Sequence, residues 1–305
     1  MKKDQLENFI AIVEAGSINK AAEKLYITQP SLSRSMKSLE EEMGKPLLER
    51  NTHGVSLTAT GKIFYNYAQS ILNQFNMLER LKDFDEDVVY SKLSVSVNSI
   101  FLEDNLIYNF YKKINSLETE ISILETLADD VLNDVASSTS EIGIIVLNDF
   151  QLKIFRRMAE IKDIELEIFD EGPLVIHSHE SCSLNTYEKI ESKELMSHIY
   201  IHLPYDFISN LNYTLQVDEI GLKDLSKTIT MTSYHAVLKM LQNTDSFILG
   251  NKWQVKELKA SHIDSREIQN SKIIKYFIII KRKGIPLSRP AEVFLELIRN
   301  DYKDS

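Results

Sequence analysis

The start of the chain carries apolar side chains at the spacing of amphipathic helices. Four apolar residues at positions i, i+3, i+4 and i+7 predict a helix over residues 4–14, and Gly16 ends it. Ser17 can cap a short second helix over residues 18–25, whose small alanine side chains allow another helix to approach closely. The apolar stripe of the first helix consists of Leu6, Phe9, Ile10 and Val13.

A third helix follows, and its two faces differ in chemistry. Thr28 can cap this helix, and Pro30 is tolerated in its first turn because the N–H that proline lacks would have no intrahelical partner there. The apolar face, which we expect to point inward, is formed by Leu32, Met36, Leu39 and Met43. The opposite face carries Gln29, Ser33 and Lys37, with Arg34 beside them.

The polar face of the third helix has the chemistry of a DNA recognition helix. Short or amide side chains near a helix N-terminus can contact base edges, and cations can hold phosphates. We expect Gln29, Pro30 and Ser33 to contact base edges, and Ser31 and Arg34 to bind phosphate. The expected DNA-binding set also includes Thr28, Lys37 and Arg50. A small helical bundle with a solvated polar face is the alternative.

Residues 47–58 predict a β-hairpin. A short apolar strand, a polar turn that contains Gly54 and an alternating strand follow one another in this segment. Arg50, at the base of the hairpin, is placed to contact the DNA backbone or the minor groove. Beside a recognition helix such a hairpin would be the wing of a winged helix. A bare surface hairpin is the alternative.

Several segments of the first 61 residues keep the spacing of one protein family. They are residues 9–17, 21–25, 28–34, 39–40, 48–50 and 57–61. Together they resemble the LysR-type transcriptional regulators, and linked segments at fixed intervals are far more specific than a single motif. The resemblance implies a winged helix-turn-helix over residues 1–60 that binds a double-stranded DNA operator. It also implies linker helices that pair two copies of the chain.

The residues after Thr58 predict a long helix with the spacing of a coiled coil. Apolar residues at intervals of 4, 3, 4 and 3 form a seam of two heptads. The seam consists of Phe64, Ala68, Ile71, Phe75 and Leu78. We expect it to join two copies, and packing against the chain's own second domain is the alternative. Residues 58–90 would form this linker helix and a hinge, because the acidic segment 82–91 lacks periodicity.

The remainder, residues 91–305, alternates short apolar runs with helical patterns. This order predicts an α/β effector domain with largely parallel sheets. The expected strands are residues 93–97, 121–124, 142–147, 166–169, 174–177, 199–203, 228–231, 247–249 and 276–280. The expected helices are residues 104–114, 129–136, 234–241 and 289–299.

The family resemblance is weaker in this second part and rests on the order of the elements. It implies two periplasmic-binding-protein-like lobes, residues 92–165 with 271–305 and residues 166–270, with a small-molecule effector between them. Ligands of open α/β sheets lie beyond the carboxyl ends of strands, where we look for side chains that could bind an effector. The candidates are Ser99, Thr126, His202, Thr232 and Ser233. Ordinary helix-capping and turn roles are the alternative.

Charge and composition limit the possible functions. The net charge is −10, but residues 1–62 carry nine basic and eight acidic side chains, so the acidic excess lies outside the expected DNA-binding head. The sequence contains no Gly-rich phosphate loop and no G-x-S-x-G or H-E-x-x-H motif. Its one cysteine and its short apolar runs indicate neither disulfides nor a membrane segment. We therefore expect a cytoplasmic protein without a cofactor.

Residues 177–202 contain five potential ligands of zinc or copper. They are His177, His179, Cys182, His198 and His202. Their spacing matches no standard site, so the sequence favours no metal, and the zinc content of protein purified without chelators would test this. Two alternatives to an effector-controlled regulator also stay open. One is an enzyme with catalytic residues scattered along the chain, and the other is a DNA-bound factor without a ligand.

Overall fold

The computed structural model describes residues 1–51, 54–80, 90–100, 102, 104–114, 118–202, 204, 208, 216–217, 220–221 and 224–302. The chain divides into two compact units, formed mainly by Met1–Asp87 and by Val88–Ser305. Residues 82–89 of the expected hinge, and Thr52 and His53 of the expected wing turn, lie outside the described residues. The two units are described separately below.

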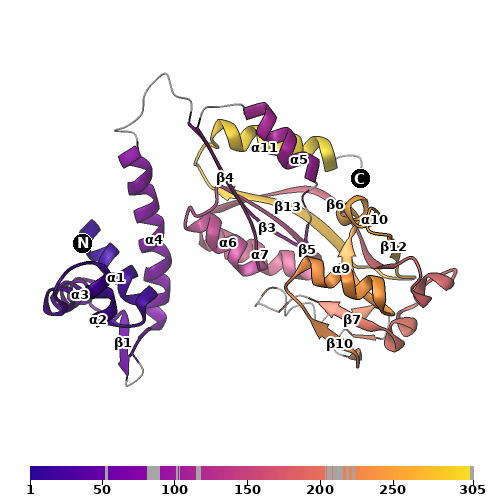
Figure 1. Ribbon diagram of the computed structural model, residues 1–305, viewed down its shortest axis with the longest axis horizontal. Coiled ribbons are helices and arrows are strands. Elements are labelled where there is room, and N and C mark those ends of the chain that lie inside the picture. The colour runs from indigo at the N-terminus through magenta and orange to yellow at the C-terminus, as the bar shows by residue number, and fades with distance from the viewer. Residues whose placement is uncertain are drawn as a thin grey trace. The chain divides into compact units, whose positions relative to one another are not determined.

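The first unit consists of helices and one hairpin, as the sequence predicts (Figure 1). Its elements are α1 (Lys3–Ala15), α2 (Ile18–Lys24), α3 (Gln29–Met43), β1 (Leu48–Asn51), β2 (Gly54–Leu57) and α4 (Ala59–Arg80). Gly16 ends α1 with φ +61, a left-handed conformation that costs glycine little. Ser17 Oγ accepts a hydrogen bond of 3.5 Å from the backbone N–H of Lys20 and caps α2.

The core of the first unit lies between α1, α2, α3 and the start of α4. Phe9 of α1 and Leu32 of α3 are completely buried, as the helical periodicity of their segments predicts. Phe9 also packs edge-on against Phe64 of α4, with ring centroids 5.2 Å apart. The start of the long helix is thus a structural part of the head.

The second unit is built around a sheet of nine described strands, in the order β10-β7-β11-β6-β13-β5-β3-β4 with β12 paired to β6. The strands are β3 (Tyr90–Asn98), β4 (Glu118–Glu125), β5 (Ile142–Asn148), β6 (Ile164–His179), β7 (Ile199–His202), β10 (Thr228–Thr230), β11 (Ser246–Asn251), β12 (Ile263–Glu267) and β13 (Ile274–Arg282). The helices are α5 (Asp104–Ile114), α6 (Ala128–Ala136), α7 (Asp149–Ile161), α9 (Tyr234–Asn243), α10 (Val255–Lys259) and α11 (Arg289–Tyr302).

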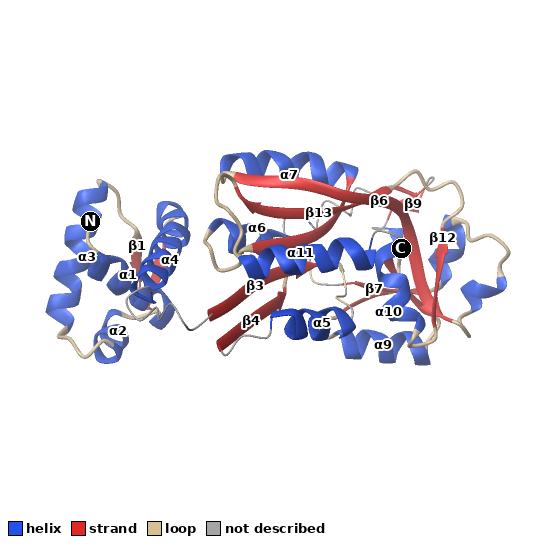
Figure 2. Ribbon diagram, turned by 90° about the horizontal axis from the view of Figure 1, so that it is seen from above, coloured by secondary structure: helices blue, strands red, loops and turns tan. Residues whose placement is uncertain are grey.

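Helices cover both faces of the first half of this sheet. Helices α5 and α11 lie on one face, and α6 and α7 lie on the other (Figures 1 and 2). The largest hydrophobic core lies under the first pair, where Phe110 of α5 meets Phe294 of α11 with ring centroids 5.4 Å apart. The apolar run of β5 is buried at every position because helices cover both of its faces.

The long strand β6 connects the two halves of the sheet. Its residues up to Pro173 pair with β13, and its residues from Leu174 onward pair with β11 and β12. The expectation of two separate strands, 166–169 and 174–177, is therefore wrong. The intervening Asp-Glu-Gly-Pro segment has the composition of a turn, but its backbone pairs with β13 and the strand continues.

One further expectation for the second unit needs correction. The pairs that involve β6 and β13 are antiparallel, so the sheet is mixed and its centre is not parallel. The sequence also gave no expectation of α7, which starts at a capping box in which Asn148 and Gln151 exchange hydrogen bonds of 2.8 and 3.0 Å.

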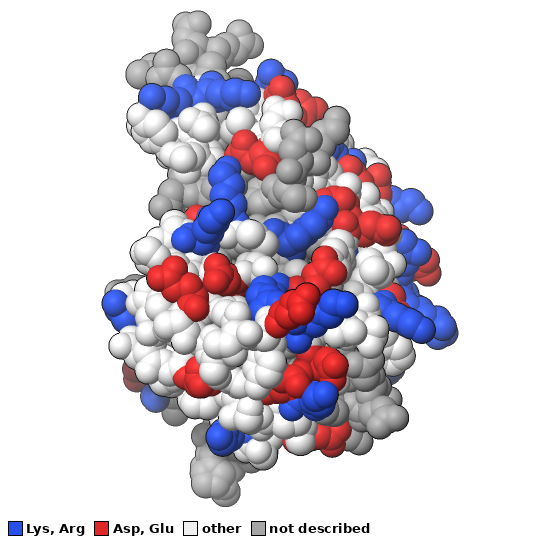
Figure 3. All heavy atoms as spheres, turned by 90° about the vertical axis from the view of Figure 1, so that its right-hand side faces the viewer, with Lys and Arg blue, Asp and Glu red and all other residues white. Residues whose placement is uncertain are grey.

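Charge is mixed over the face of the molecule drawn in Figure 3. Lys and Arg side chains alternate there with Asp and Glu, so that face does not present a field of one sign. None of the helices in the described part of the chain combines the length and the apolar character needed to cross a bilayer.

Candidate functional site

The expected recognition helix α3 presents its polar side chains to solvent. Gln29 and Arg34 are exposed, Ser33 is half-buried, and Leu32 and Met36 on the opposite side are buried. The other expected contact residues of this helix and its cap are also exposed: Thr28, Pro30, Ser31 and Lys37. The first two turns of α3 thus form one continuous polar surface.

Three side chains of this surface are held by bonds within α3. Gln29 Nε2 donates a hydrogen bond of 2.8 Å to Ser33 Oγ, and Arg34 Nε donates one of 3.3 Å to the backbone carbonyl of Pro30. Lys37 Nζ lies 3.7 Å from Glu41 Oε1, in a solvent-exposed i, i+4 pair. These bonds order the polar face before any partner binds.

Thr28 occupies the N-cap position of α3 but does not cap it as the sequence suggests. Its side chain accepts no capping hydrogen bond, and its backbone carbonyl instead accepts from the N–H of Leu32 at 3.1 Å. The Thr28 hydroxyl is therefore not used by the helix end, and the side chain is exposed.

The hairpin β1–β2 is fastened to α3 and to the turn after α1. Glu40 Oε1 of α3 accepts hydrogen bonds from the backbone N–H groups of Leu47 and Leu48, at 2.7 and 3.0 Å. The N–H of Val55 donates to the carbonyl of Gly16 at 2.9 Å. The position of the expected wing is therefore fixed relative to α3. The backbone of Arg50 lies in β1, and its side chain is outside the described residues.

The expected dimer seam along α4 is only partly available to a second copy. Phe64 and Ala68 are 9% and 1% exposed, because they pack into the core of the first unit. Ile71 also packs against this core, whereas Phe75 is 42% and Leu78 60% exposed. The assignment of Phe64 and Ala68 to an intermolecular seam is wrong. Their heptad spacing reflects packing against the chain's own head.

A different apolar face of α4 is exposed. Ile63 and Tyr67 are 62% and 60% exposed, and each lies one position before a residue of the expected seam. With Leu78 and the edge of Phe75 they form an exposed apolar face along α4, which we call the α4 face. The predicted helix is present, but its exposed apolar side lies about one residue before the predicted seam.

Two of the five candidate effector contacts are joined by a hydrogen-bonded chain at the carboxyl ends of β3 and β4. Ser99 Oγ donates to Asn98 Oδ1 at 2.9 Å, and Asn98 Nδ2 donates to the carbonyl of Thr126 at 2.6 Å. Asn251, at the end of β11, donates from Nδ2 to the carbonyl of Ser99 at 2.7 Å. Ser99 has φ +58, a left-handed conformation that is strained for a residue with a side chain.

The other three candidates lie around β7 and the start of α9. His202 Nε2 is 3.4 Å from Thr230 Oγ1, and Ser233 caps α9 by accepting from the N–H of Ala236 at 3.4 Å. Thr232 lies between them along the chain and is exposed. The capping role that we weighed for Ser233 is therefore present in the structure.

A half-buried cation lies at the same edge of the sheet as the Ser99 group. Lys275 of β13 pairs in register with Asn148 at the carboxyl end of β5, the sheet edge at which β3 also ends. Burial lowers the pKa of Lys275 to about 8, and the nearby Asp149 carboxylate opposes that shift. At neutral pH this ammonium is still mostly charged.

Two of the five potential metal ligands lie together in space. Cys182 Sγ, a ring nitrogen of His198 and a carboxylate oxygen of Asp245 lie within 4.8 Å of one another. His177 instead bonds Ser265 Oγ at 2.7 Å, and His179 bonds Ser181 Oγ at 2.7 Å. Asp245 is a third potential ligand, which the spacing of the histidines and the cysteine does not predict.

Comparison with known proteins connects the first unit to one family. Residues 4–62 match the bacterial regulatory helix-turn-helix proteins of the lysR family. The HTH-type transcriptional regulator TfdT of Cupriavidus pinatubonensis is 43% identical over 72 residues, which are 24% of this chain and 32% of TfdT. A probable RuBisCO transcriptional regulator of Phaeodactylum tricornutum is 26% identical over 98% of both chains. Residues 4–62 therefore belong to the LysR family of helix-turn-helix domains.

The LysR likeness extends to the fold of the whole chain. CbnR, a solved LysR family transcriptional regulator, aligns over 98% of this chain and 99% of its own, with a TM-score of 0.60 and 20% identity. A full-length OxyR structure from Pseudomonas aeruginosa gives the same TM-score at 19% identity. The match to TfdT covers about a third of that relative, and the match to BenM of Acinetobacter baylyi covers 26% of it.

The match of residues 4–62 to regulatory helix-turn-helix proteins favours a regulator over the enzymatic alternative. The structure adds site residues that the sequence analysis missed. They are Glu40, Asn98, Asn251, Asp245 and Lys275. Only the Asn98 position, at the end of an expected strand, carried a usable sequence signal.

Proposed function

We propose that this chain is a LysR-type DNA-binding transcriptional regulator that binds a double-stranded operator as a homodimer or homotetramer. The observation that carries this proposal is the exposed polar face of α3 within a matching helix-turn-helix. Gln29 and Ser33 supply groups that can bond base edges, and Arg34 and Lys37 supply cations for phosphates. A structure of CbnR complexed with its target DNA, with a TM-score of 0.58, supports the same role for this fold.

Selection from a random duplex library tests the DNA-binding proposal. Full-length protein should enrich one sequence with two half-sites related by two-fold symmetry, because paired heads read paired half-sites. The enriched duplex should bind more tightly than a shuffled duplex of equal length at the same salt concentration. Equal binding of both duplexes would overturn the proposal.

The nearly balanced charge of the head is a reason to expect self-association. With nine basic and eight acidic side chains, residues 1–62 gain little from bulk electrostatics, so one head should bind DNA weakly. Pairing of two heads raises the effective affinity without new contacts. The α4 face supports such pairing, because exposed apolar surfaces of this kind often form interfaces between protein molecules.

A second apolar surface, on the second unit, supports assembly beyond one contact. An open hollow of about 640 Å³ lies between α5 and β4. Its lining consists of Ile107, Tyr108, Tyr111, Ile121 and Ile123. We propose that a second copy of this chain covers it, since two independent self-contacts would allow a tetramer.

We further propose that a small anionic effector binds at the carboxyl ends of β3, β4 and β5. Ser99 and Thr126 supply hydroxyl groups there, and Lys275 supplies a cation. Asn251 joins Ser99 to the second half of the sheet, so a bound effector can bias how the two halves are arranged. His202, Thr232 and Ser233 are candidates for contacts from that second half.

Thermal shift of the full-length protein with a panel of small carboxylates, phosphates and neutral analogues tests the effector proposal. A ligand that binds only the folded state raises the apparent melting temperature. We expect an anion to raise it, and we expect Lys275→Met to reduce that rise. If no anion shifts the wild type, the alternative of a regulator without a ligand is favoured.

A further inference from the structure

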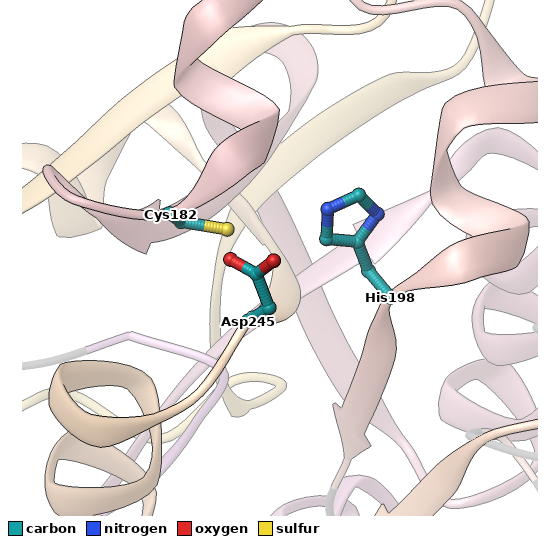
Figure 4. A group of neighbouring side chains, drawn as sticks. All are labelled: Cys182, His198 and Asp245. Atoms are coloured by element: carbon teal, nitrogen blue, oxygen red, sulfur yellow. The ribbon is translucent and has the colours of Figure 1, made fainter.

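A group of three metal-ligand side chains lies at the amino ends of two neighbouring strands, at the opposite end of β11 from Asn251. His198 directly precedes β7, Asp245 directly precedes β11, and Cys182 lies in the turn after β6. We propose that these three residues bind one divalent transition metal ion of the zinc class. Their ligand atoms lie within 4.8 Å of one another and face a common centre (Figure 4).

His198 is held in the tautomer that a metal ligand needs. Its Nδ1 lies 2.8 Å from the backbone carbonyl of Glu194, which can only accept a hydrogen bond, so Nδ1 carries the proton. The lone pair is then on Nε2, which is directed at Ser183 Oγ, 2.7 Å away. Bonding of one ring nitrogen to a backbone carbonyl is the usual way in which proteins orient a metal-binding histidine.

Ser183 orients the side chain of Asp245. The backbone N–H of Ser183 donates to Oδ1 at 2.9 Å, and Oδ2 lies 2.7 Å from the Ser183 hydroxyl, whose one hydrogen can be donated either to this oxygen or to Nε2 of His198. The Ser183 hydroxyl therefore lies between Nε2 of His198 and the Asp245 carboxylate. A metal ion at this centre displaces that hydroxyl or takes it as a fourth ligand.

The donor set selects the class of metal. A thiolate and an imidazole suit zinc and related transition metals, whereas calcium and magnesium prefer oxygen ligands. Cys182 would release its proton on binding the ion, and the resulting thiolate and the carboxylate of Asp245 would together balance a charge of 2+. Three protein ligands with one position for water or a hydroxyl is a known arrangement for zinc.

The proposed metal site is separate from the proposed effector site. Ser246 and Asn251 are the two ends of β11, and a strand of this length spans about 17 Å at roughly 3.3 Å per residue. The ion would join the turn after β6 to the starts of β7 and β11. It would thus stabilise the second half of the sheet, where the turn lies.

Cobalt titration of the full-length protein tests the site. Protein that has been stripped of metal should bind one equivalent of Co²⁺ with a thiolate-to-cobalt absorption band in the near ultraviolet, and Zn²⁺ should displace it. Asp245→Asn and His198→Gln should each weaken Co²⁺ binding at least tenfold. The exposed residues Asp264 and His262 provide matched controls, and Asp264→Asn and His262→Gln should bind like the wild type.

Asp245 is exposed, so Asp245→Asn is expected to keep the fold, and circular dichroism checks this for both variants. Zn²⁺ should raise the melting temperature of the wild type but not that of Asp245→Asn. Absence of the cobalt band in the wild type would overturn the proposal. So would full-strength binding by folded Asp245→Asn. Neither result depends on DNA, so failure here leaves the DNA-binding proposal unchanged.

Discussion

Gln29 and Ser33 lie one turn apart on α3, and Gln29 Nε2 donates a hydrogen bond of 2.8 Å to Ser33 Oγ. The bond uses one of the two amide hydrogens of Gln29 and leaves its Oε1 and its second hydrogen available. A glutamine that is held in this way loses less side-chain entropy when it bonds a base edge. Two of the three residues that we expect to contact bases therefore act as one unit.

This unit predicts different effects for two substitutions on α3. Gln29→Ala should weaken operator binding and relax base preference by about 1–3 kcal/mol, since it removes contacts to a base edge. Arg34→Ala should weaken binding to specific and shuffled DNA by similar factors, because a phosphate contact carries no sequence information. Competition binding with the selected and the shuffled duplex measures both effects.

Lys20→Ala removes a cation from an exposed position of α2. It is the control for losing a cation that does not lie on α3. It should change binding less than Arg34→Ala. If Gln29→Ala and Arg34→Ala both bind the operator like the wild type, α3 is not the recognition helix.

Replacement of Glu40 should lower the stability of the head more than replacement of its neighbour Glu41. Glu40→Ala leaves the N–H groups of Leu47 and Leu48 without their carboxylate acceptor, which should cost about 1–3 kcal/mol in the free energy of unfolding. Glu41→Ala removes only an exposed pair with Lys37 and should cost less than about 1 kcal/mol. Urea unfolding of the full chain measures both. Equal costs would contradict the role of Glu40 in holding the wing.

The helices of the head were predictable because their signals are local. Four apolar residues at helical spacing, Gly16 at a helix end and Ser17 at a helix start each act within one or two turns. The residues that fasten these elements together were not predictable. Glu40 has the polar character of an ordinary solvent-facing residue of α3, and only the folded hairpin brings two N–H groups to its carboxylate.

The same limit explains the errors in the second unit. Asp245 joins His198 and Cys182 only because β11 and β7 pair side by side, and strand order cannot be deduced from the spacing of these residues. The heptad pattern of α4 predicts the helix, but it does not distinguish whether the apolar side packs against the same chain or against a second copy. Phe64 packs against Phe9 of its own chain, so the same apolar spacing serves the head's core.

Substitutions on the two sides of α4 should have opposite outcomes. Tyr67→Glu places a charge on the exposed α4 face and should dissociate the assembly without unfolding the head. Phe64→Glu buries a charge in the head's core and should unfold it. Sedimentation gives the mass, and circular dichroism gives the fold.

Asn66→Glu, at an exposed polar position of α4, controls for added charge and should leave the mass unchanged. If Tyr67→Glu sediments at the wild-type mass, the part of the α4 face around Tyr67 is not where copies of the chain meet. A combined Tyr67→Glu and Leu78→Glu variant then tests whether the C-terminal end of α4, where Leu78 lies, holds the copies together.

His177 predicts how stability depends on pH. Burial lowers its pKa to about 4 from an ordinary value of 6.5, so the folded protein keeps the imidazole neutral while the unfolded chain takes up a proton. The contribution of His177 to the free energy of unfolding is constant above about pH 6.5. It falls as the pH drops toward 4, and the loss is about 1 kcal/mol by pH 5.5. His177→Gln should remove this part of the loss, whereas His262→Gln, at an exposed position, should retain it. Urea unfolding at pH 7.5 and 5.5 gives the two differences, and the same loss in all three proteins would show that His177 is not protonated on unfolding.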